Sequence, residues 1–213
     1  MLKVENLSVS HGAIRALHEI SFNVEKGQLA AVIGANGAGK TTLLRSIAGL
    51  IAPSDGTIRF GKQLVSLSSL VMPPHKRKIG YVPQEGALFP HLSVADNIAF
   101  GLDRSVFTKD QIRQTTKEML TLIGLQGYEN RMPNQLSGGQ QTRVALARAL
   151  AIKPAIVLLD EPKTNSEYIY YYKDGKQPTK GTPYNTAGWT SVEVAGNIIE
   201  RIGPILATKH IEN

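Results

Sequence analysis

The sequence predicts an α/β fold with a mostly parallel sheet, and three observations support that class. An apolar run over 29–33 predicts a buried strand, and a glycine-rich loop and a helical pattern over 42–50 follow it. A second apolar run, 155–159, ends in two carboxylates. Between the two runs, residues 108–122 place apolar side chains at helical spacing. Strands that alternate with helices are typical of a parallel sheet covered by helices.

The remaining elements follow from short apolar alternations and from helix-capping residues. Strands are also predicted over 2–8, 16–24, 57–60 and 79–83. The segment 61–78 is predicted to be irregular. Helices are predicted to begin at Ser93, at Thr108 with a capping box to Gln111, and at Ser137 with one to Gln140.

Length and composition limit the function. The 213 residues suffice for one α/β domain with an appendage, and the formal net charge is +7. The one tight basic cluster, 75–78, is too short to indicate nucleic-acid binding and is typical of a solvated loop. The chain lacks cysteine, so it forms no disulfide and no thiolate metal site. We expect no signal peptide and no membrane span, so a membrane role would need a partner.

The glycine-rich loop carries the strongest functional signal. Residues 34–41 match G-x-x-x-x-G-K-[ST], a phosphate-binding loop, between a strand and a helix as that motif requires. Backbone N–H groups of such a loop and the helix N-terminus favour phosphate oxygens. Lys40 would reach the terminal phosphates, and the Thr41 hydroxyl could bind Mg²⁺. The predicted nucleotide contacts here are Gly34, Asn36, Gly37, Ala38, Gly39, Lys40, Thr41 and Thr42.

Asp160 and Glu161 follow the second apolar strand. Ligands of parallel sheets bind where the strands end, so Asp160 could hold Mg²⁺ and Glu161 could activate water. A solvated turn is the alternative, and the phosphate-binding loop in the same chain disfavours it.

Three further positions are ambiguous from the residues alone. Gly138 and Gly139 beside Ser137 expose backbone donors at a helix start, which suits an anion, but a capped helix without a ligand fits as well. Gln84 could touch Mg²⁺ or be a surface glutamine. His11 could stack on a purine base or be a loop histidine.

Together these motifs resemble the nucleotide-binding subunit of ATP-binding-cassette (ABC) transporters over about residues 1–162. They stand in the family's order: Walker A at 34–41, the Q-loop at Gln84, the signature at 136–140, and Walker B at 156–160 followed by Glu161. The resemblance implies a phosphate-loop ATPase core, an N-terminal antiparallel β part, and a helical signature subdomain over about 85–152.

The resemblance also implies cofactors, partners and roles. ATP and Mg²⁺ would lie between two subunits arranged head to tail, each nucleotide meeting the other subunit's Ser137–Gln140 segment. Thr41, Gln84 and Asp160 would hold Mg²⁺, and Glu161 would position the attacking water. A homodimer or heterodimer would work with integral membrane permease subunits at the cytoplasmic face of the membrane, and no nucleic acid is expected.

Two hints about the substrate disagree. The segment 74–94 is similar to importers of ferric iron, and more loosely of polyamines or sulfate. The segments 12–17 and 33–40 are more similar to branched-chain amino-acid importers.

The segment 163–213 departs from the family pattern, because no Leu-Asp follows the Walker B carboxylates. One interpretation is an inserted hairpin, then a helix over 191–202 and a short strand over 205–208, with His210 as the switch histidine. The favoured interpretation is unrelated sequence, in which His210 has no such role. A chain of this fold that binds ATP but hydrolyses it poorly is therefore the alternative function.

Overall fold

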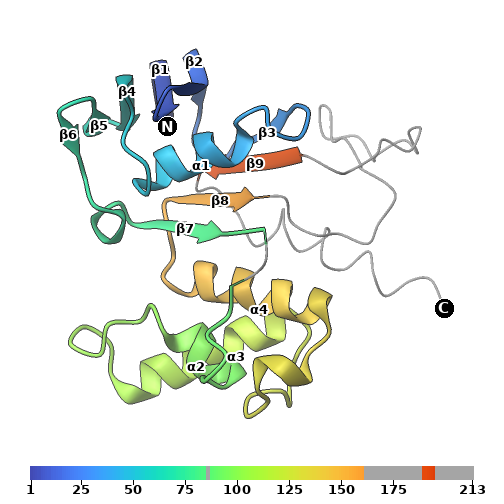
Figure 1. Cartoon of the computed structure of the whole chain (residues 1–213). Helices are drawn as coiled ribbons and strands as arrows, with labels where there is room; N and C mark the ends of the chain where they lie inside the picture. Colours follow the sequence, from blue (N-terminus) through green and yellow to red (C-terminus); the bar gives the residue numbers. More distant parts are fainter. Residues whose placement is uncertain (85–86, 161–188, 195–213) are drawn as a thin grey trace, which may run out of the picture.

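Two sheets and two helical layers make up the part of the chain that the computed structural model describes, residues 1–84, 87–160 and 189–194. Helix α1 lies between the sheets, and the remaining helices lie on the other side of the second sheet (Figure 1). The α/β class is confirmed.

The first sheet is antiparallel, with strand order β2-β1-β4-β5-β6. Its strands are β1 (Leu2–His11), β2 (Ile14–Val24), β4 (Asp55–Phe60), β5 (Gln63–Leu67) and β6 (Leu70–Val71). The prediction that 61–78 is irregular is wrong, because β5 and β6 lie there with a 3₁₀ turn, η1 (Pro74–Lys76). These strands are too short for their alternation to stand out, and they are stabilised by backbone pairing of β5 with β4 and of β6 with β5.

The second sheet contains β3 (Leu29–Ile33), β7 (Ile79–Val82), β8 (Ile156–Asp160) and β9 (Trp189–Val194), in the order β3-β9-β8-β7. Strands β7 and β8 are parallel, and β9 is antiparallel to both of its neighbours. Strands β3, β7 and β8 therefore run in one direction, as the sequence predicts.

Strand β9 corrects the prediction of a helix over 191–202. Residues 191–194 belong to the strand, and 195–202 lie outside the described residues. Thr190 and Glu193 have the spacing of a capping box, but the segment Trp-Thr-Ser-Val-Glu-Val is rich in residues of high β propensity. Pairing on both sides satisfies the backbone of β9, which outweighs a local helix signal. The predicted hairpin at 168–175 and strand over 205–208 also lie outside the described residues.

The helices are α1 (Lys40–Ala48), α2 (Val94–Ala99), α3 (Lys109–Leu122) and α4 (Gly138–Ala151), with a 3₁₀ turn η2 (Pro133–Gln135). The Ser93 cap and the capping boxes at Thr108 and Ser137 are confirmed. Among the helices of the described part, none is both long and apolar enough to cross a membrane.

Two hydrophobic cores lie on opposite faces of the second sheet, and β8 contributes to both. Ile156 and Leu158 face α1 and the first sheet, whereas Val157 faces α4 and the helices beneath it. This alternation has a consequence for the site, because Asp160 has the same parity as Leu158. Its side chain therefore points toward α1, as strand geometry requires.

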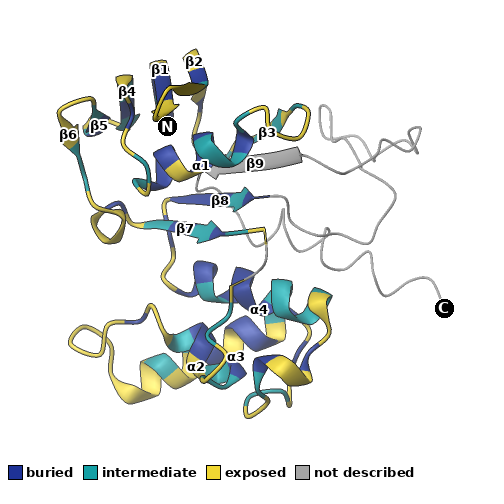
Figure 2. Cartoon of the chain, in the orientation of Figure 1, coloured by how far each residue is buried: buried dark blue, intermediate teal, exposed yellow. Residues whose placement is uncertain are grey.

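The prediction of a buried strand at 29–33 is wrong for one of its faces. Ala30 and Val32 pack against the core below α1, but Leu29 is 51% exposed and Ile33 is 73% exposed (Figure 2). A buried strand would be covered on both of its faces, whereas the described elements cover only one face of β3.

Arg77 corrects the interpretation of the basic cluster as a solvated loop. It is 3% exposed, and its guanidinium ties the end of α1 to the first sheet. Burial lowers the pKa of Arg77 to about 10, so the group stays charged at neutral pH. It donates to the carbonyls of Ser46, Ile47, Val65 and Met72 and to the hydroxyl of Ser66.

Candidate nucleotide-binding site

The phosphate-binding loop joins β3 to α1, and its last glycine is required by sterics. Gly39 caps α1 with φ 88°, a left-handed conformation that L side chains rarely adopt. A Cβ on Gly39 would lie 2.6 Å from the carbonyl oxygen of Ala16 in β2. The first turn of α1 contains no acidic residue, so the positive end of the helix faces the loop uncompensated.

Lys40 lies across this loop. Its ammonium group donates to the carbonyls of Gly34 and Ala35, at 2.9 Å each, and the side chain is 6% exposed. The bonds hold the charge inside the concave side of the loop. Phosphate oxygens placed there would meet that ammonium and the N-terminus of α1 together.

Asp160 meets α1 across the end of the sheet. It is 2% exposed, and the Thr41 hydroxyl donates to its Oδ1 at 2.9 Å. The contact spans 119 positions in sequence, and it forms because the parity of β8 directs Asp160 toward α1. The structure thus brings together the two predicted metal ligands that come from different halves of the chain.

Gln84 follows β7 after one residue, Pro83. Strands β7 and β8 end at the same edge of the sheet, on the side where β3 leads into α1 (Figure 1). Gln84 is therefore at the correct edge, and its role toward Mg²⁺ stays a prediction. Glu161 and His210 lie outside the described residues, so their predicted roles also stay predictions.

His11 is exposed at the end of β1, where its backbone pairs with Ile14 of β2. The same hairpin carries Ala16, whose carbonyl lies against Gly39. His11 therefore belongs to the hairpin that borders the phosphate-binding loop, and its stacking on a base stays a prediction.

The segment Ser137–Gln140 lies apart from this site. It begins α4, on the opposite face of the second sheet from α1 (Figure 1). Its capping groups are occupied within the segment: the Ser137 hydroxyl accepts from the Gln140 N–H at 3.3 Å, and the Gln140 side chain accepts from the Ser137 N–H at 2.9 Å. Ser137 and Gly138 are exposed. The chain does not bring these residues to its own phosphate-binding loop.

Tyr81 is a site residue that the sequence interpretation missed. Its hydroxyl donates to Oδ2 of Asp160 at 3.0 Å. Burial is the main reason why the pKa of Tyr81 is raised above its usual value. The available signal was its place one residue before the end of β7, since ligands of a parallel sheet bind where the strands end.

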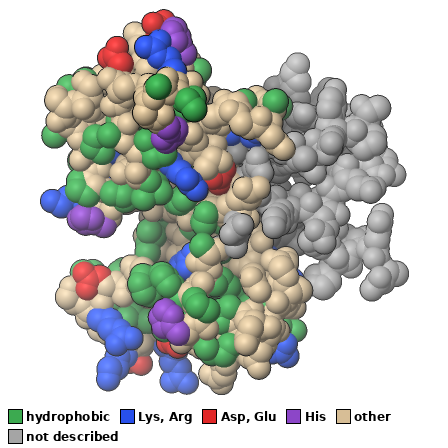
Figure 3. Space-filling view, in the orientation of Figure 1, with side chains coloured by type: hydrophobic (Ala, Val, Ile, Leu, Met, Phe, Trp, Pro, Cys, Tyr) green, Lys and Arg blue, Asp and Glu red, His purple; other side chains and the backbone are tan. Residues whose placement is uncertain are grey.

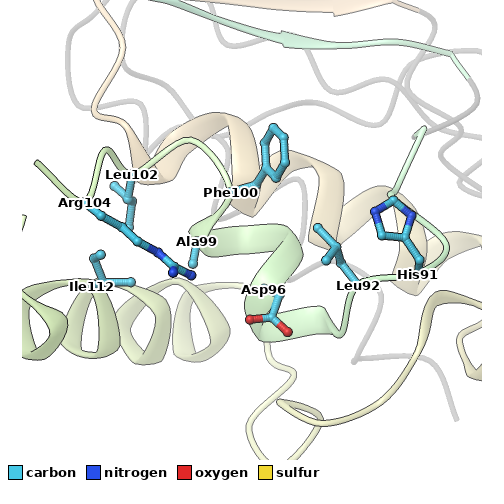
Figure 4. A pocket seen from close by; sticks show the side chains of 8 residues that line it. All are labelled: His91, Leu92, Asp96, Ala99, Phe100, Leu102, Arg104 and Ile112. Carbon is cyan, nitrogen blue, oxygen red and sulfur yellow. The ribbon is translucent and has the colours of Figure 1, made fainter.

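A separate pocket of about 430 Å³ lies in the helical layer. Figure 4 shows its lining, in which apolar side chains lie beside three polar ones, His91, Asp96 and Arg104. The apolar lining residues are Leu92, Ala99, Phe100, Leu102 and Ile112. In Figure 3, hydrophobic side chains lie on both sides of a hollow between the upper and lower parts of the molecule.

Asn97 of α2, which is fully buried, holds residues 89–93 against the helix that supplies part of the pocket lining. The Asn97 amide donates to the carbonyls of Phe89, Leu92 and Ser93 and accepts from the Phe89 N–H. The Phe89 ring lies 4.2 Å from that of Phe100, between ring centroids. Phe89 is thus held against the pocket wall.

Comparison with known proteins gives consistent matches. Residues 17–164 match the family model described as ABC transporter. The chain is 44% identical over 162 residues to an Fe(3+) ions import ATP-binding protein of Haemophilus influenzae, covering 76% of this chain and 46% of that protein. It is 45% identical over 163 residues to a sulfate/thiosulfate import ATP-binding protein of Halalkalibacterium halodurans, covering 75% of this chain and 44% of that protein. The chain thus spans about half the length of the curated relatives that it matches.

Solved structures agree. The dimeric, post-hydrolysis structure of the ATP-binding cassette MJ0796 with ADP and phosphate is 33% identical, with a TM-score of 0.68. The match covers 76% of this chain and 74% of that one. A second dimeric structure of the same bacterial ABC transporter cassette has a TM-score of 0.69 at 32% identity.

Proposed function

Because the chain belongs to the ABC transporter ATP-binding family, we propose that it binds and hydrolyses Mg²⁺·ATP to power import through a membrane permease. One observation carries the proposal: Lys40, Thr41 and Asp160 converge at the edge of the sheet where the phosphate-binding loop opens into α1. That convergence joins a phosphate-binding cation to two oxygen ligands of the kind that Mg²⁺ prefers.

The residues present fit Mg²⁺. The Thr41 hydroxyl and the buried Asp160 carboxylate are hard oxygen donors within 2.9 Å of each other. Among the described residues, no group of three or more His, Cys, Asp or Glu side chains could hold a metal by itself. Mg²⁺ suits such a sparse donor set, because it keeps waters and phosphate oxygens as its other ligands. When bound, it would neutralise charge that develops on the phosphates.

Side chains and backbone groups of the chain would then bind the phosphates, the metal and the attacking water. The Lys40 ammonium would exchange its two loop carbonyls for phosphate oxygens, and the N-terminus of α1 would add its backbone donors. Asp160 and Thr41 would orient the metal, with Gln84 at the same edge. Glu161, the next residue of the chain, would hold the attacking water, which is a prediction from the sequence.

A second subunit would complete the site. The Ser137–Gln140 segment is exposed and faces away from its own phosphate-binding loop, so it would contact a nucleotide held by a second copy or by a related subunit. The two matched cassette structures are both described as dimeric, which supports this arrangement.

The permease partner would dock on the helical layer at the cytoplasmic face of the membrane. The pocket lined by Phe100 and its neighbours would receive an apolar segment of the permease, and the Asn97-held loop would connect it to Gln84. The relatives above are named for Fe(3+) and for sulfate or thiosulfate import. We therefore favour an inorganic ion as the transported substrate over a branched-chain amino acid.

Steady-state Mg²⁺·ATP hydrolysis by the purified chain tests the proposal, with Glu161→Gln and Lys40→Ala beside it. We expect turnover in the native chain, ATP binding without turnover in Glu161→Gln, and about 100-fold weaker ATP binding in Lys40→Ala, because about two charge-assisted hydrogen bonds are lost. Lys26→Ala, an exposed lysine in a turn, controls for loss of charge. A native chain that binds ATP and matches Glu161→Gln in showing no turnover, also with a permease present, would instead establish a binding module.

A further inference from the structure

Tyr81 touches the site through a single polar atom. In β7 it pairs in register with Leu158 of β8, two residues before Asp160. Both side chains face α1, and the Tyr81 hydroxyl lies 3.0 Å from Oδ2 of Asp160. The rest of the ring packs against the core below α1.

The direction of this hydrogen bond follows from the two groups that it joins. An aspartate carboxylate only accepts hydrogen bonds, whereas a phenol hydroxyl carries a proton that it can donate. The Tyr81 hydroxyl is therefore the donor, and Oδ2 of Asp160 is the acceptor.

Asp160 is thereby held at two points. Oδ1 accepts from the Thr41 hydroxyl at 2.9 Å, and Oδ2 accepts from Tyr81 at 3.0 Å. Two donors on different oxygens fix the rotation of the carboxylate about its last single bond. A carboxylate oxygen has two lone pairs, so accepting one hydrogen bond does not prevent it from binding a metal or a metal-bound water.

We propose that Tyr81 is a positioning residue that orients the Asp160 carboxylate for Mg²⁺. This inference rests on the proposed function, since it concerns the same nucleotide site. Removing a residue that orients a metal ligand through a hydrogen bond typically lowers the metal affinity about 10- to 100-fold. Tyr81→Phe keeps the ring and its packing and removes only the hydroxyl.

The test compares nucleotide affinity with and without metal, measured by calorimetry on the full chain with the non-hydrolysable analogue AMP-PNP. In the native chain Mg²⁺ should tighten binding relative to EDTA. In Tyr81→Phe we expect that tightening to fall about tenfold, while the affinity in EDTA stays within about twofold. Tyr128→Phe is the matched control, because it removes a phenol hydroxyl from the helical layer, where the ring is held by Arg131.

A further comparison separates positioning from general damage. In an Asp160→Asn background Mg²⁺ should no longer tighten AMP-PNP binding. Adding Tyr81→Phe should then change the ratio of the affinity in Mg²⁺ to the affinity in EDTA by less than about twofold. An unchanged ratio in Tyr81→Phe, or an equal loss in Tyr128→Phe, would overturn the inference while leaving the proposed function intact. Failure of the native chain to bind AMP-PNP would overturn both.

Discussion

Helices α1 and α4 each have a glycine at their N-terminus, and the surroundings of these two glycines differ. At the start of α1, Gly39 is held at φ 88° with a carbonyl oxygen of β2 where a side chain would begin. At the start of α4, Gly138 has open space around it and no positive φ. The first glycine is required by the fold of this chain, and the second is not.

The surrounding side chains differ in the same way. The α1 start carries a buried lysine and lies beside a buried aspartate. The α4 start is exposed, and its capping groups bond to each other. The site at the start of α1 is therefore assembled within one chain. The α4 start has the features of a surface that keeps its backbone accessible to another molecule.

Gly39→Ala should give the largest effect. Positive φ costs about 1–2 kcal/mol for a residue with a side chain, and overlap with the Ala16 carbonyl adds a similar amount, so we expect roughly 3 kcal/mol of lost stability. Nucleotide affinity should be lost with it. Urea unfolding and calorimetric titration with AMP-PNP measure the two quantities.

Gly37→Ala is the control for Gly39→Ala. Gly37 also has a positive φ, 82°, but nothing lies within 4 Å of its added Cβ. It should lose only about 1–2 kcal/mol. Equal losses at the two positions would contradict the role given to the Ala16 carbonyl.

Ser137→Ala should give an intermediate effect. Loss of the cap should cost about 1 kcal/mol of stability. The ATP affinity of the dilute monomer should stay within about twofold, because the segment lies away from its own phosphate-binding loop. ATP-dependent dimerisation in a Glu161→Gln background should weaken, and sedimentation velocity measures it.

The matched control for Ser137→Ala is Thr108→Ala. Thr108 forms the same kind of capping box at the start of α3. It should lose about as much stability, about 1 kcal/mol, without any change in dimerisation. If Thr108→Ala weakened the dimer equally, the effect of Ser137→Ala would be one of stability alone.

Gly138→Ala should change stability least, by less than about 0.5 kcal/mol, because the position has ordinary φ and free space. If the proposed function holds, it should nevertheless weaken the ATP-dependent dimer, since the added methyl group would lie where the partner's nucleotide is proposed to bind. Chemical denaturation and sedimentation velocity on the same samples check both. A stable variant that dimerises normally would remove the distinction between the two glycines.

Much of the fold follows from local pattern. The capping boxes at Thr108 and Ser137, the strand that ends at Asp160 and the loop at 34–41 are all predicted at their observed places. Each depends on residues within a few positions of one another, so the sequence contains the whole signal. The predictions that failed depend on distant partners: the backbone of β9 pairs with β3 and β8, and Arg77 is buried by α1 and β5.

The residue types of the site can be identified from the sequence alone: a lysine and a threonine follow a glycine-rich loop, and an aspartate follows an apolar strand. Which of these side chains contact one another depends on the tertiary structure. The parity of β8 turns Asp160 toward Thr41, and the pairing of β7 with β8 brings Tyr81 to the same carboxylate. The physical reason is that side-chain type is a local property. Contact across 79 or 119 positions is created by strand pairing and burial, which no local pattern encodes.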